Sequence, residues 1–402
     1  MREKLKSVFL VLLWSIAGLM LMNVVAQFAV YPIWSRQLGE TAYGDILYLI
    51  SLMNILAVSV GSSCNYTRIM ATVNGKTSNS PYTMFMLIVS ILMVPMALLI
   101  SQFGGVPMTP LETATFALLM CATMWRYYAD VEFRMELNYK GCFFYYAIIS
   151  FGYGVGICLF VFCHAPWPMA LLPGELLGII SVLLRGHILP FDGSCTVSQF
   201  WKVARPLLTL LTSEIISTLI FNGDRILLKA ILGGAAVTTY YLASLLGKTV
   251  SLISTPLNSV LAGYLARYHG RLNVRVMTGI TIGASVLAGV GTLVCTAASF
   301  LLLPVLYPDE VATASPFFVM ANFAQVLYFI TNVITVVLLR FSDTKVQVVI
   351  NVEYGTLFCL LCIPFTLVEG LMGFCIGLLL SNLVRFVTAV AFGYHTALYG
   401  KR

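Results

Sequence analysis

Five ionisable side chains lie deep inside long apolar segments of the sequence: Glu175, Glu214, Lys248, Glu353 and Arg385. At the centre of a helix in lipid, a charged side chain costs about 2.5–3.5 kcal/mol on insertion scales, so it is expected to face a wet cavity or an opposite charge. Lys248 and Arg385 can attract an anion, and Arg binds phosphate through two parallel hydrogen bonds. We therefore predict that these two cations contact an anionic ligand.

A second interpretation places the same charges in interhelical ion pairs, with Glu214 and Glu353 neutralising Lys248 and Arg385. Both interpretations require the same depth, so the sequence leaves them open. Together with Glu175, the two carboxylates are also candidate sites for binding a coupling proton or sodium ion, because desolvation favours the protonated or ion-bound form.

Neutral polar side chains supply further candidates. Asn322, Gln325 and Asn332 fall on one face of an apolar helix, where amides can bind sugar hydroxyls across a wet cavity. Interhelical hydrogen bonds, worth about 0.6 kcal/mol on average, are the alternative, and we favour the cavity. Arg225 is a candidate ligand contact at an outer helix end, although a salt bridge with the adjacent Asp224 is the favoured interpretation.

The elements that must position these residues follow from composition. Of the 402 residues, 59% are hydrophobic and 10% are charged, against about 25% charged in ordinary soluble domains. Apolar stretches long enough to cross a bilayer must form helices, because backbone groups in lipid need internal partners and the stretches are too long for barrel strands. We therefore predict an all-α polytopic membrane protein with about 12 transmembrane helices, at 8–34, 43–62, 82–103, 113–129, 142–163, 167–184, 206–223, 236–262, 276–304, 316–339, 346–367 and 370–394.

The basic residues predict the orientation of these spans. We place the N-terminus on the inner side of the membrane. Of the 23 Lys and Arg residues, Lys248 and Arg385 then lie within spans, three lie on the outer side (Arg36, Arg225 and Lys229), and the other 18 lie on the inner side. This bias predicts that both termini are cytoplasmic, and it explains the net charge of +7 without nucleic acid as a partner.

A repeat predicts two parallel six-helix halves, residues 1–190 and 191–402. The segment Leu38-Gly39-Glu40-Thr41-Ala42-Tyr43 joins the first two spans of the first half. A similar segment, Leu232-Gly233-Gly234-Ala235-Ala236-Val237, joins the first two spans of the second half. Because each half has an even number of spans, both halves begin on the same side of the membrane.

Several classes of function are disfavoured. Most of the ten cysteines lie inside predicted spans, and the four histidines show no metal-ligand or catalytic-triad spacing. A phosphate-binding loop is excluded at Gly247-Lys248-Thr249, because Leu242 occupies the place of the required first glycine. We predict no catalytic residue, no metal site and no cofactor, and hence a transporter rather than an enzyme.

The sequence resembles a known family in two places. The segment Trp34-Ser35-Arg36-Gln37-Leu38-Gly39-Glu40-Thr41-Ala42-Tyr43-Gly44 resembles the first outer loop of polysaccharide (O-antigen-type) flippases of the multidrug/oligosaccharidyl-lipid/polysaccharide exporter superfamily. The second half is similar to that family's seventh and eighth helices at Asp224-Arg225-Ile226-Leu227-Leu228, Leu232-Gly233, Tyr240-Tyr241-Leu242-Ala243, Pro256-Leu257 and Ser259-Val260-Leu261, before Arg267.

The resemblance implies a flippase that moves an undecaprenyl-diphosphate-linked oligosaccharide to the outer leaflet of the bacterial cytoplasmic (inner) membrane by alternating access, coupled to a proton or sodium gradient. It also implies contacts with membrane lipids, a polysaccharide polymerase and chain-length machinery. The alternatives are a drug or cation antiporter of the same superfamily and a membrane-embedded polysaccharide polymerase or ligase. Antiporters of this superfamily usually have an acidic residue in the first helix. The first span here holds only Asn23 and Gln27 as strongly polar groups, which disfavours the antiporter.

Overall fold

The computed structural model confirms the predicted fold class. It describes Trp14, residues 16–73, 78–136, 138–252, Leu261, Leu265, Gly270 and residues 272–342 and 344–399. These described residues form helices and connecting turns, without a strand. Eight helical runs among them are long and apolar enough to cross a membrane, as a polytopic membrane protein requires.

Two compact units make up the chain. Unit 1 comprises Met1–Gly39 and Asp45–Ile226, and unit 2 comprises Glu40–Gly44 and Leu227–Arg402. Glu40–Gly44 belongs to unit 2 because it packs on the helix that starts at Gly234: Thr238 donates a hydrogen bond to the Glu40 carbonyl (2.7 Å). The units are defined by contacts rather than by the sequence repeat, so the predicted boundary between residues 190 and 191 stays a prediction.

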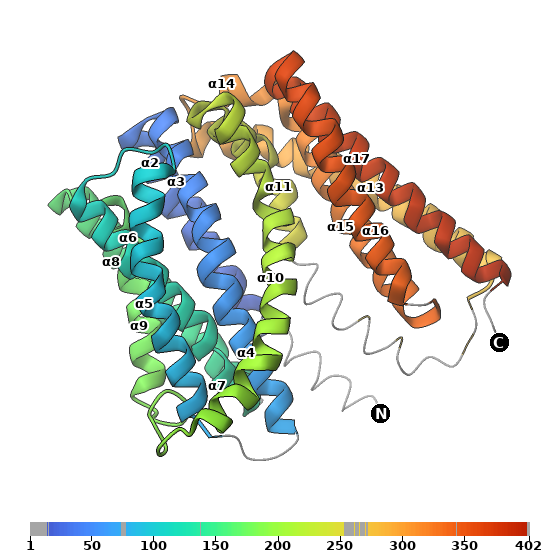
Figure 1. Ribbon diagram of the computed structural model, residues 1–402. Coiled ribbons are helices and arrows are strands. Elements are labelled where there is room, and N and C mark those ends of the chain that lie inside the picture. Colours follow the sequence, from blue (N-terminus) through green and yellow to red (C-terminus); the bar gives the residue numbers. More distant parts are fainter. Residues whose placement is uncertain are drawn as a thin grey trace. The chain divides into compact units, whose positions relative to one another are not determined.

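In unit 1, α6 packs on α4, α5 and α9, while α8 packs on α9 (Figure 1). The chain is helical from residue 16 and passes through the π-helical turn Ala26–Val30 into α2. The helices are α2 (Tyr31–Leu38), α3 (Glu40–Met53, from Asp45 on in unit 1), α4 (Ser59–Val73), α5 (Ser80–Phe103), α6 (Pro110–Ala129), α7 (Val131–Met135), α8 (Tyr139–Cys163), α9 (Leu172–Leu183) and α10 (Val197–Leu232, to Ile226 in unit 1).

In unit 2, α15 is the central helix and contacts α11, α13, α16 and α17 (Figure 1). The helices after the end of α10 are α11 (Gly234–Leu252), α13 (Val274–Leu306), α14 (Val311–Ala314), α15 (Phe318–Phe341), α16 (Thr344–Leu357) and α17 (Ile363–Tyr399). A non-helical backbone at Gly370 (φ 60°, ψ −137°) interrupts α17. Gly370 is the first residue of the predicted span 370–394, so the break lies at the start of that span, close to the end of the span 346–367.

Each of the twelve predicted spans coincides with a helical segment where the structure describes it. The start of the first span and the end of the eighth, including Pro256-Leu257, lie outside the described residues, as does Arg267. The cytoplasmic location of the termini stays a prediction.

Each of the two repeated Leu-Gly pairs ends one helix and directly precedes the next. Helix α2 ends at Leu38 and α10 ends at Leu232, and the next helix begins one residue after the intervening glycine. Gly39 and Gly233 have φ values of 82° and 88°, which L side chains rarely adopt. The sequence repeat therefore marks two equivalent helix–glycine–helix corners.

Small residues let α8 and α9 approach closely within unit 1. A Cβ atom on Gly152 would lie 2.4 Å from Gly174 Cα on α9, and one on Gly156 would lie 2.2 Å from the carbonyl oxygen of Ala170, in the 3₁₀ helix Trp167–Ala170 just before α9. Backbones at such distances gain dispersion contacts, which drive helix association in lipid.

Replacing Gly152 by Val is expected to force these backbones apart and to destabilise the chain by about 1–3 kcal/mol, the usual range for overpacking. Gly154→Val is the matched control, because a Cβ at Gly154 meets no atom within 4 Å. Thermal unfolding in detergent measures both variants. Equal melting temperatures would contradict close packing of α8 on α9.

The connection after α9 is fastened to the start of α5 by Asp192. Its carboxylate accepts hydrogen bonds from the hydroxyls of Ser78 (2.7 Å) and Ser80 (2.8 Å) and from the backbone N–H groups of Asn79 (2.6 Å) and Ser80 (3.0 Å). Desolvation acts to raise the pKa of Asp192, but these hydrogen bonds outweigh it and hold the pKa below its ordinary value.

A carboxyl with a lowered folded pKa stabilises the fold fully above its unfolded pKa, about 3.9, and loses that contribution as pH falls through the folded pKa. Asp192→Asn is therefore expected to melt at a lower temperature than the wild type at pH 7. The difference should narrow as the pH falls below about 4. Melting curves across pH 2–7 check this, and a pH-independent difference would refute it.

Candidate functional site

Arg385 is the centre of the candidate site in unit 2. It lies on α17 and is 3% exposed. Its Nη2 donates hydrogen bonds to the Oδ1 atoms of Asn332 on α15 (2.8 Å) and Asn351 on α16 (3.2 Å). The ring centroids of Tyr328 and Tyr354 lie 4.6 and 4.9 Å from the guanidinium carbon, where cation–π attraction contributes about 0.5–2 kcal/mol. Neutral groups from two helices, α15 and α16, thus surround a buried cation on a third.

Two donors of this guanidinium remain unused. Nε and Nη1 of Arg385 are buried and donate no hydrogen bond among the described residues. No described carboxylate lies within salt-bridge distance of Arg385, and Oε1 of Glu353 instead accepts a hydrogen bond from Thr388 (2.9 Å). Unused buried donors on a charged group are costly. The described site is therefore chemically suited to an anion.

The other two candidate amides on α15 join helices. Asn322 is fully buried; its Oδ1 accepts from the Gly247 backbone N–H (2.8 Å), and its Nδ2 donates to Ser299 Oγ (3.2 Å). Gln325 Nε2 donates to the Tyr240 hydroxyl (3.0 Å). Asn322 thus has the geometry of the interhelical alternative, linking α15 to α11 and α13. The substrate role of both amides stays a prediction.

Three further candidate residues, Lys248, Arg225 and Glu214, lie on α11 and α10. Lys248 on α11 is 8% exposed and directly follows Gly247. In unit 1, the backbone N–H of Arg225 donates to the Asp224 carboxylate (2.9 Å) and its Nη1 to Ser51 Oγ (3.4 Å). Glu214, on α10, is half-buried and forms no salt bridge with a described residue. Their roles in binding or coupling stay predictions.

Glu175 lies in unit 1 and has two strong partners. Its Oε2 pairs with Arg126 Nε at 2.7 Å, and its Oε1 accepts a hydrogen bond from the Tyr153 hydroxyl at 2.6 Å. Both charged side chains are 4% exposed. The pair connects α6 to α9, and Tyr153 adds α8.

Arg68 and Arg126 are buried cations that the charge pattern assigned to the inner surface. Arg68 is 2% exposed and donates to the Tyr128 hydroxyl (2.5 Å), the Asn79 side chain and the Ile188 carbonyl (3.4 Å). Their partners are far away along the chain, so residue spacing carried no signal of these contacts.

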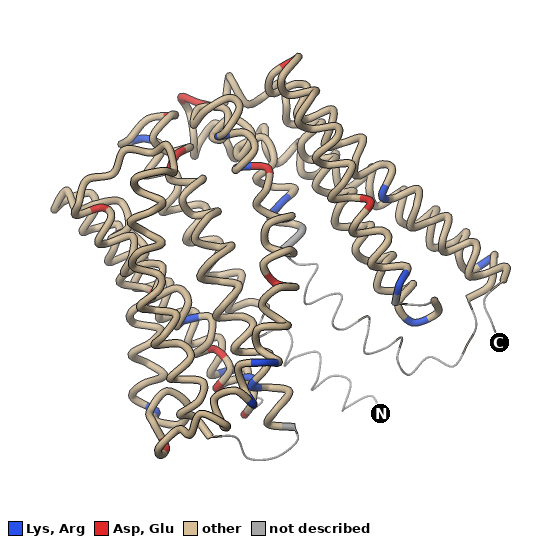
Figure 2. The backbone as a smooth tube through the Cα atoms, in the orientation of Figure 1, with Lys and Arg blue, Asp and Glu red and all other residues tan. Residues whose placement is uncertain are grey.

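Asp130 is a further buried charge of unit 1, and its carboxylate has several hydrogen-bond partners. It accepts hydrogen bonds from the Tyr146 hydroxyl (2.8 Å) and Asn65 Nδ2 (3.2 Å) and pairs with Arg134 Nε (2.5 Å). Figure 2 shows that within unit 1 many of the charged residues gather at the end of the helices where α7 lies.

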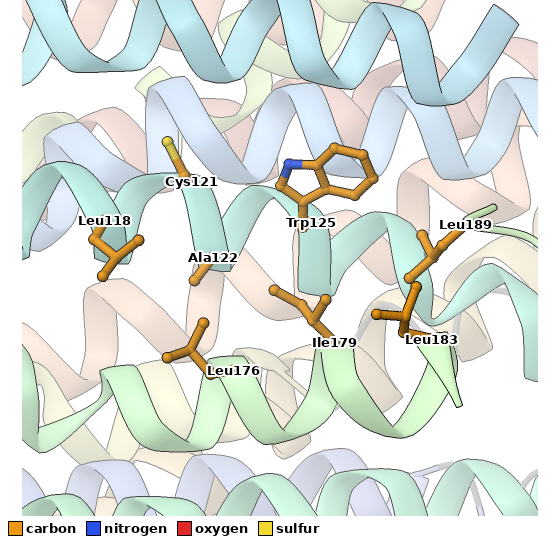
Figure 3. A pocket seen from close by; sticks show the side chains of 8 residues that line it. All are labelled: Leu118, Cys121, Ala122, Trp125, Leu176, Ile179, Leu183 and Leu189. Carbon is orange, nitrogen blue, oxygen red and sulfur yellow. The ribbon is translucent and has the colours of Figure 1, made fainter. Parts of the chain in front are cut away.

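An apolar pocket of about 320 Å³ lies between α6 and α9 in unit 1 (Figure 3). The indole N–H of Trp125 donates to Ser90 Oγ (2.9 Å), and the Cys121 thiol contacts the Ser90 carbonyl (3.6 Å). The polar groups of these lining side chains are therefore engaged outside the pocket, which suits hydrocarbon rather than phosphate. Its lining residues are Leu118, Cys121, Ala122, Trp125, Leu176, Ile179, Leu183 and Leu189.

Comparison with solved structures shows what fold these helices form. The chain is similar to lipid II flippase MurJ in an inward closed conformation, with a TM-score of 0.68 and 14% identity over 96% of this chain and 90% of that one. It is also similar to a multidrug resistance MATE family transporter of the MOP superfamily in its outward-facing conformation, with a TM-score of 0.66 and 16% identity over 96% and 95% of the two chains. An inward-facing conformation of such a transporter gives a TM-score of 0.62, with 14% identity over 96% and 98%.

The chain has the fold of these transporters. No protein-family model and no curated protein matches the sequence. The similarity therefore supports the predicted resemblance at the level of the fold, while the cargo has to be argued from the side chains.

Glu175→Gln is expected to destabilise the chain by about 3–5 kcal/mol, because it leaves the buried Arg126 guanidinium without its counter-charge. The double variant Arg126→Leu/Glu175→Leu should recover part of this loss, since it removes both buried charges. Unfolding in detergent gives the two values. A single variant as stable as the wild type would mean that the pair does not hold α6 to α9.

Proposed function

We propose that the chain is a flippase that moves an undecaprenyl-diphosphate-linked oligosaccharide from the cytoplasmic to the outer leaflet of the bacterial inner membrane by alternating access. The observation that carries the proposal is the buried Arg385 guanidinium, which has two unused donors and no carboxylate partner among the described residues. The fold shared with a lipid II flippase supports it.

A diphosphate suits this arginine for electrostatic reasons. Its oxygens can accept from Nε and Nη1, and hydrogen bonds between two ionised groups are roughly twice as strong as neutral ones. Asn332 and Asn351 fix the guanidinium through Nη2 and leave the other donors available. In this proposal, the amides position the cation while the cargo supplies the neutralising charge.

The arrangement favours an anionic cargo over the cation of a drug antiporter. A cationic drug needs a carboxylate at the cargo site, whereas no described carboxylate lies within salt-bridge distance of Arg385, and Glu175 is already paired with Arg126. Glu353 accepts a hydrogen bond from Thr388 at Oε1, while its buried Oε2 has no hydrogen-bond partner among the described residues and is available to a small ion. Glu353 and Glu214 are therefore our candidates for ion coupling rather than for cargo binding.

Energetics agree with outward movement of an anion. One charge crossing about 100 mV is worth about 2.3 kcal/mol, so two phosphate charges leaving a negative interior release about 4.6 kcal/mol. A proton or sodium ion moving inward through Glu214 or Glu353 would add to this driving force. A polymerase and chain-length machinery acting on the outer leaflet are the expected partners.

Arg385→Ala is expected to reduce flipping of a fluorescent undecaprenyl-diphosphate oligosaccharide in proteoliposomes by at least tenfold, because the diphosphate loses its buried cation. Arg385→Lys should retain part of the activity, since it keeps the charge but loses the planar donor fork. Arg275→Ala, at an exposed arginine on α13 of the same unit, is the matched control and should flip normally.

Full activity of a stably inserted Arg385→Ala variant would remove Arg385 from the mechanism. Transport of a cationic dye with no movement of the lipid-linked oligosaccharide would overturn the flippase proposal in favour of the antiporter.

A further inference from the structure

We propose that Glu132, Glu136 and His187 form a binding site for a divalent transition-metal ion, of the class of Zn²⁺, at the surface of unit 1. One donor atom from each side chain lies within 4.8 Å of the others. The inference is independent of the cargo. It departs from the prediction of no metal site, which rested on spacing along the sequence.

The distances between donor atoms match those around a small metal ion. His187 Nδ1 lies 3.6 Å from Glu132 Oε1 and 3.3 Å from Glu136 Oε1. In a tetrahedral site with metal–ligand bonds of about 2.0–2.1 Å, neighbouring donor atoms are about 3.3–3.5 Å apart. Both distances from His187 are therefore within a few tenths of an ångström of tetrahedral geometry, and the two carboxylate oxygens lie within 4.8 Å of each other. An ion can sit among the three atoms once the exposed Glu136 side chain adjusts, and water can complete the coordination.

The Glu132 carboxylate independently points to a bound cation. The residue is 1% exposed, yet both of its oxygens are buried without a hydrogen-bond partner among the described residues. Burying a carboxylate without hydrogen bonds is costly unless an ion pair or a metal compensates. A divalent ion would satisfy the carboxylate that the described protein groups leave unsatisfied.

The backbone holds the three ligands in place. Glu132 lies on α7 and Glu136 follows its last residue, so the two carboxylates are four residues apart on one face. The His187 carbonyl accepts a hydrogen bond from Asn79 Nδ2 (2.9 Å), and the carbonyls of Ile188 and Leu189 accept from Arg68 (3.4 Å) and Thr83 (3.0 Å). A site whose ligands are already positioned loses less entropy when it binds an ion.

Arg185 is the protein group that competes with a metal. Its Nη1 lies 3.7 Å from Glu132 Oε1, beyond hydrogen-bond length, and its guanidinium lies over the Phe133 ring at 4.6 Å. The competitor is therefore held mainly by the ring and makes only a long contact with the carboxylate. His187 and Glu136 have exposed fractions of 61% and 43%, so an ion can enter from solvent.

The proposed ion would link two parts of the chain that are distant in sequence. Glu132 and Glu136 belong to the connection between α6 and α8, and His187 belongs to the connection between α9 and α10. The imidazole favours Zn²⁺ over Mg²⁺, which prefers oxygen ligands and keeps several waters.

The test uses the full chain, purified in detergent without a histidine tag and stripped with a chelator. Zn²⁺ is titrated in competition with a fluorescent chelator, and melting temperature is recorded with and without Zn²⁺. We expect one ion per chain and a rise in melting temperature. Glu136→Gln and His187→Ala change exposed side chains, so they should fold while losing at least tenfold in affinity; Glu132→Gln should lose as much.

His395→Ala, at an exposed histidine in unit 2, is the matched control and should bind as the wild type does. Wild-type affinity in both Glu136→Gln and His187→Ala would overturn the site. So would the absence of stoichiometric Zn²⁺ binding by the wild type, or binding of Mg²⁺ as tight as that of Zn²⁺.

Discussion

The cost of burying charge away from water is the constraint on which this structure depends. A chain with so few charged residues nevertheless keeps several of them buried, and each needs compensation. In unit 1, Glu175 meets Arg126 and Asp130 meets Arg134, whereas Arg68 is surrounded by neutral hydrogen-bond acceptors. In unit 2, Arg385 has only amides and aromatic rings among the described residues. Buried charges in this chain are thus compensated either by an opposite charge or by neutral polar groups and aromatic rings.

This contrast separates buried charges that stabilise the fold from buried charges that can bind a ligand. A closed ion pair is expensive to break and fastens helices together, as Arg126 and Glu175 fasten α6 to α9. A buried cation with unused donors stabilises less and is chemically available. Relatives in fold include both a lipid flippase and multidrug transporters, so the fold admits either cargo, and such side-chain differences have to distinguish them.

Much of the fold could be predicted from the sequence because lipid imposes strong rules on composition. The helical segments follow from apolar length alone, and the corners at Gly39 and Gly233 follow from a residue that tolerates positive φ. The partners of Arg126 and Glu132 could not be predicted, because the contacts join segments that are distant in sequence. Arg385 was found by its depth, but the aromatic rings around it come from α15 and α16, and their approach depends on packing.

Helix α15 contacts the two helices of unit 2 that carry deep cations, α11 with Lys248 and α17 with Arg385. Near one end Asn322 binds the backbone of α11 beside Lys248, and ten residues on, about 15 Å along the axis, Asn332 binds Arg385. A single rigid rod therefore sets the separation of the two anchoring points. A molecule that binds both cations must carry two negative groups at a matching separation, so such a site selects by length as well as by charge.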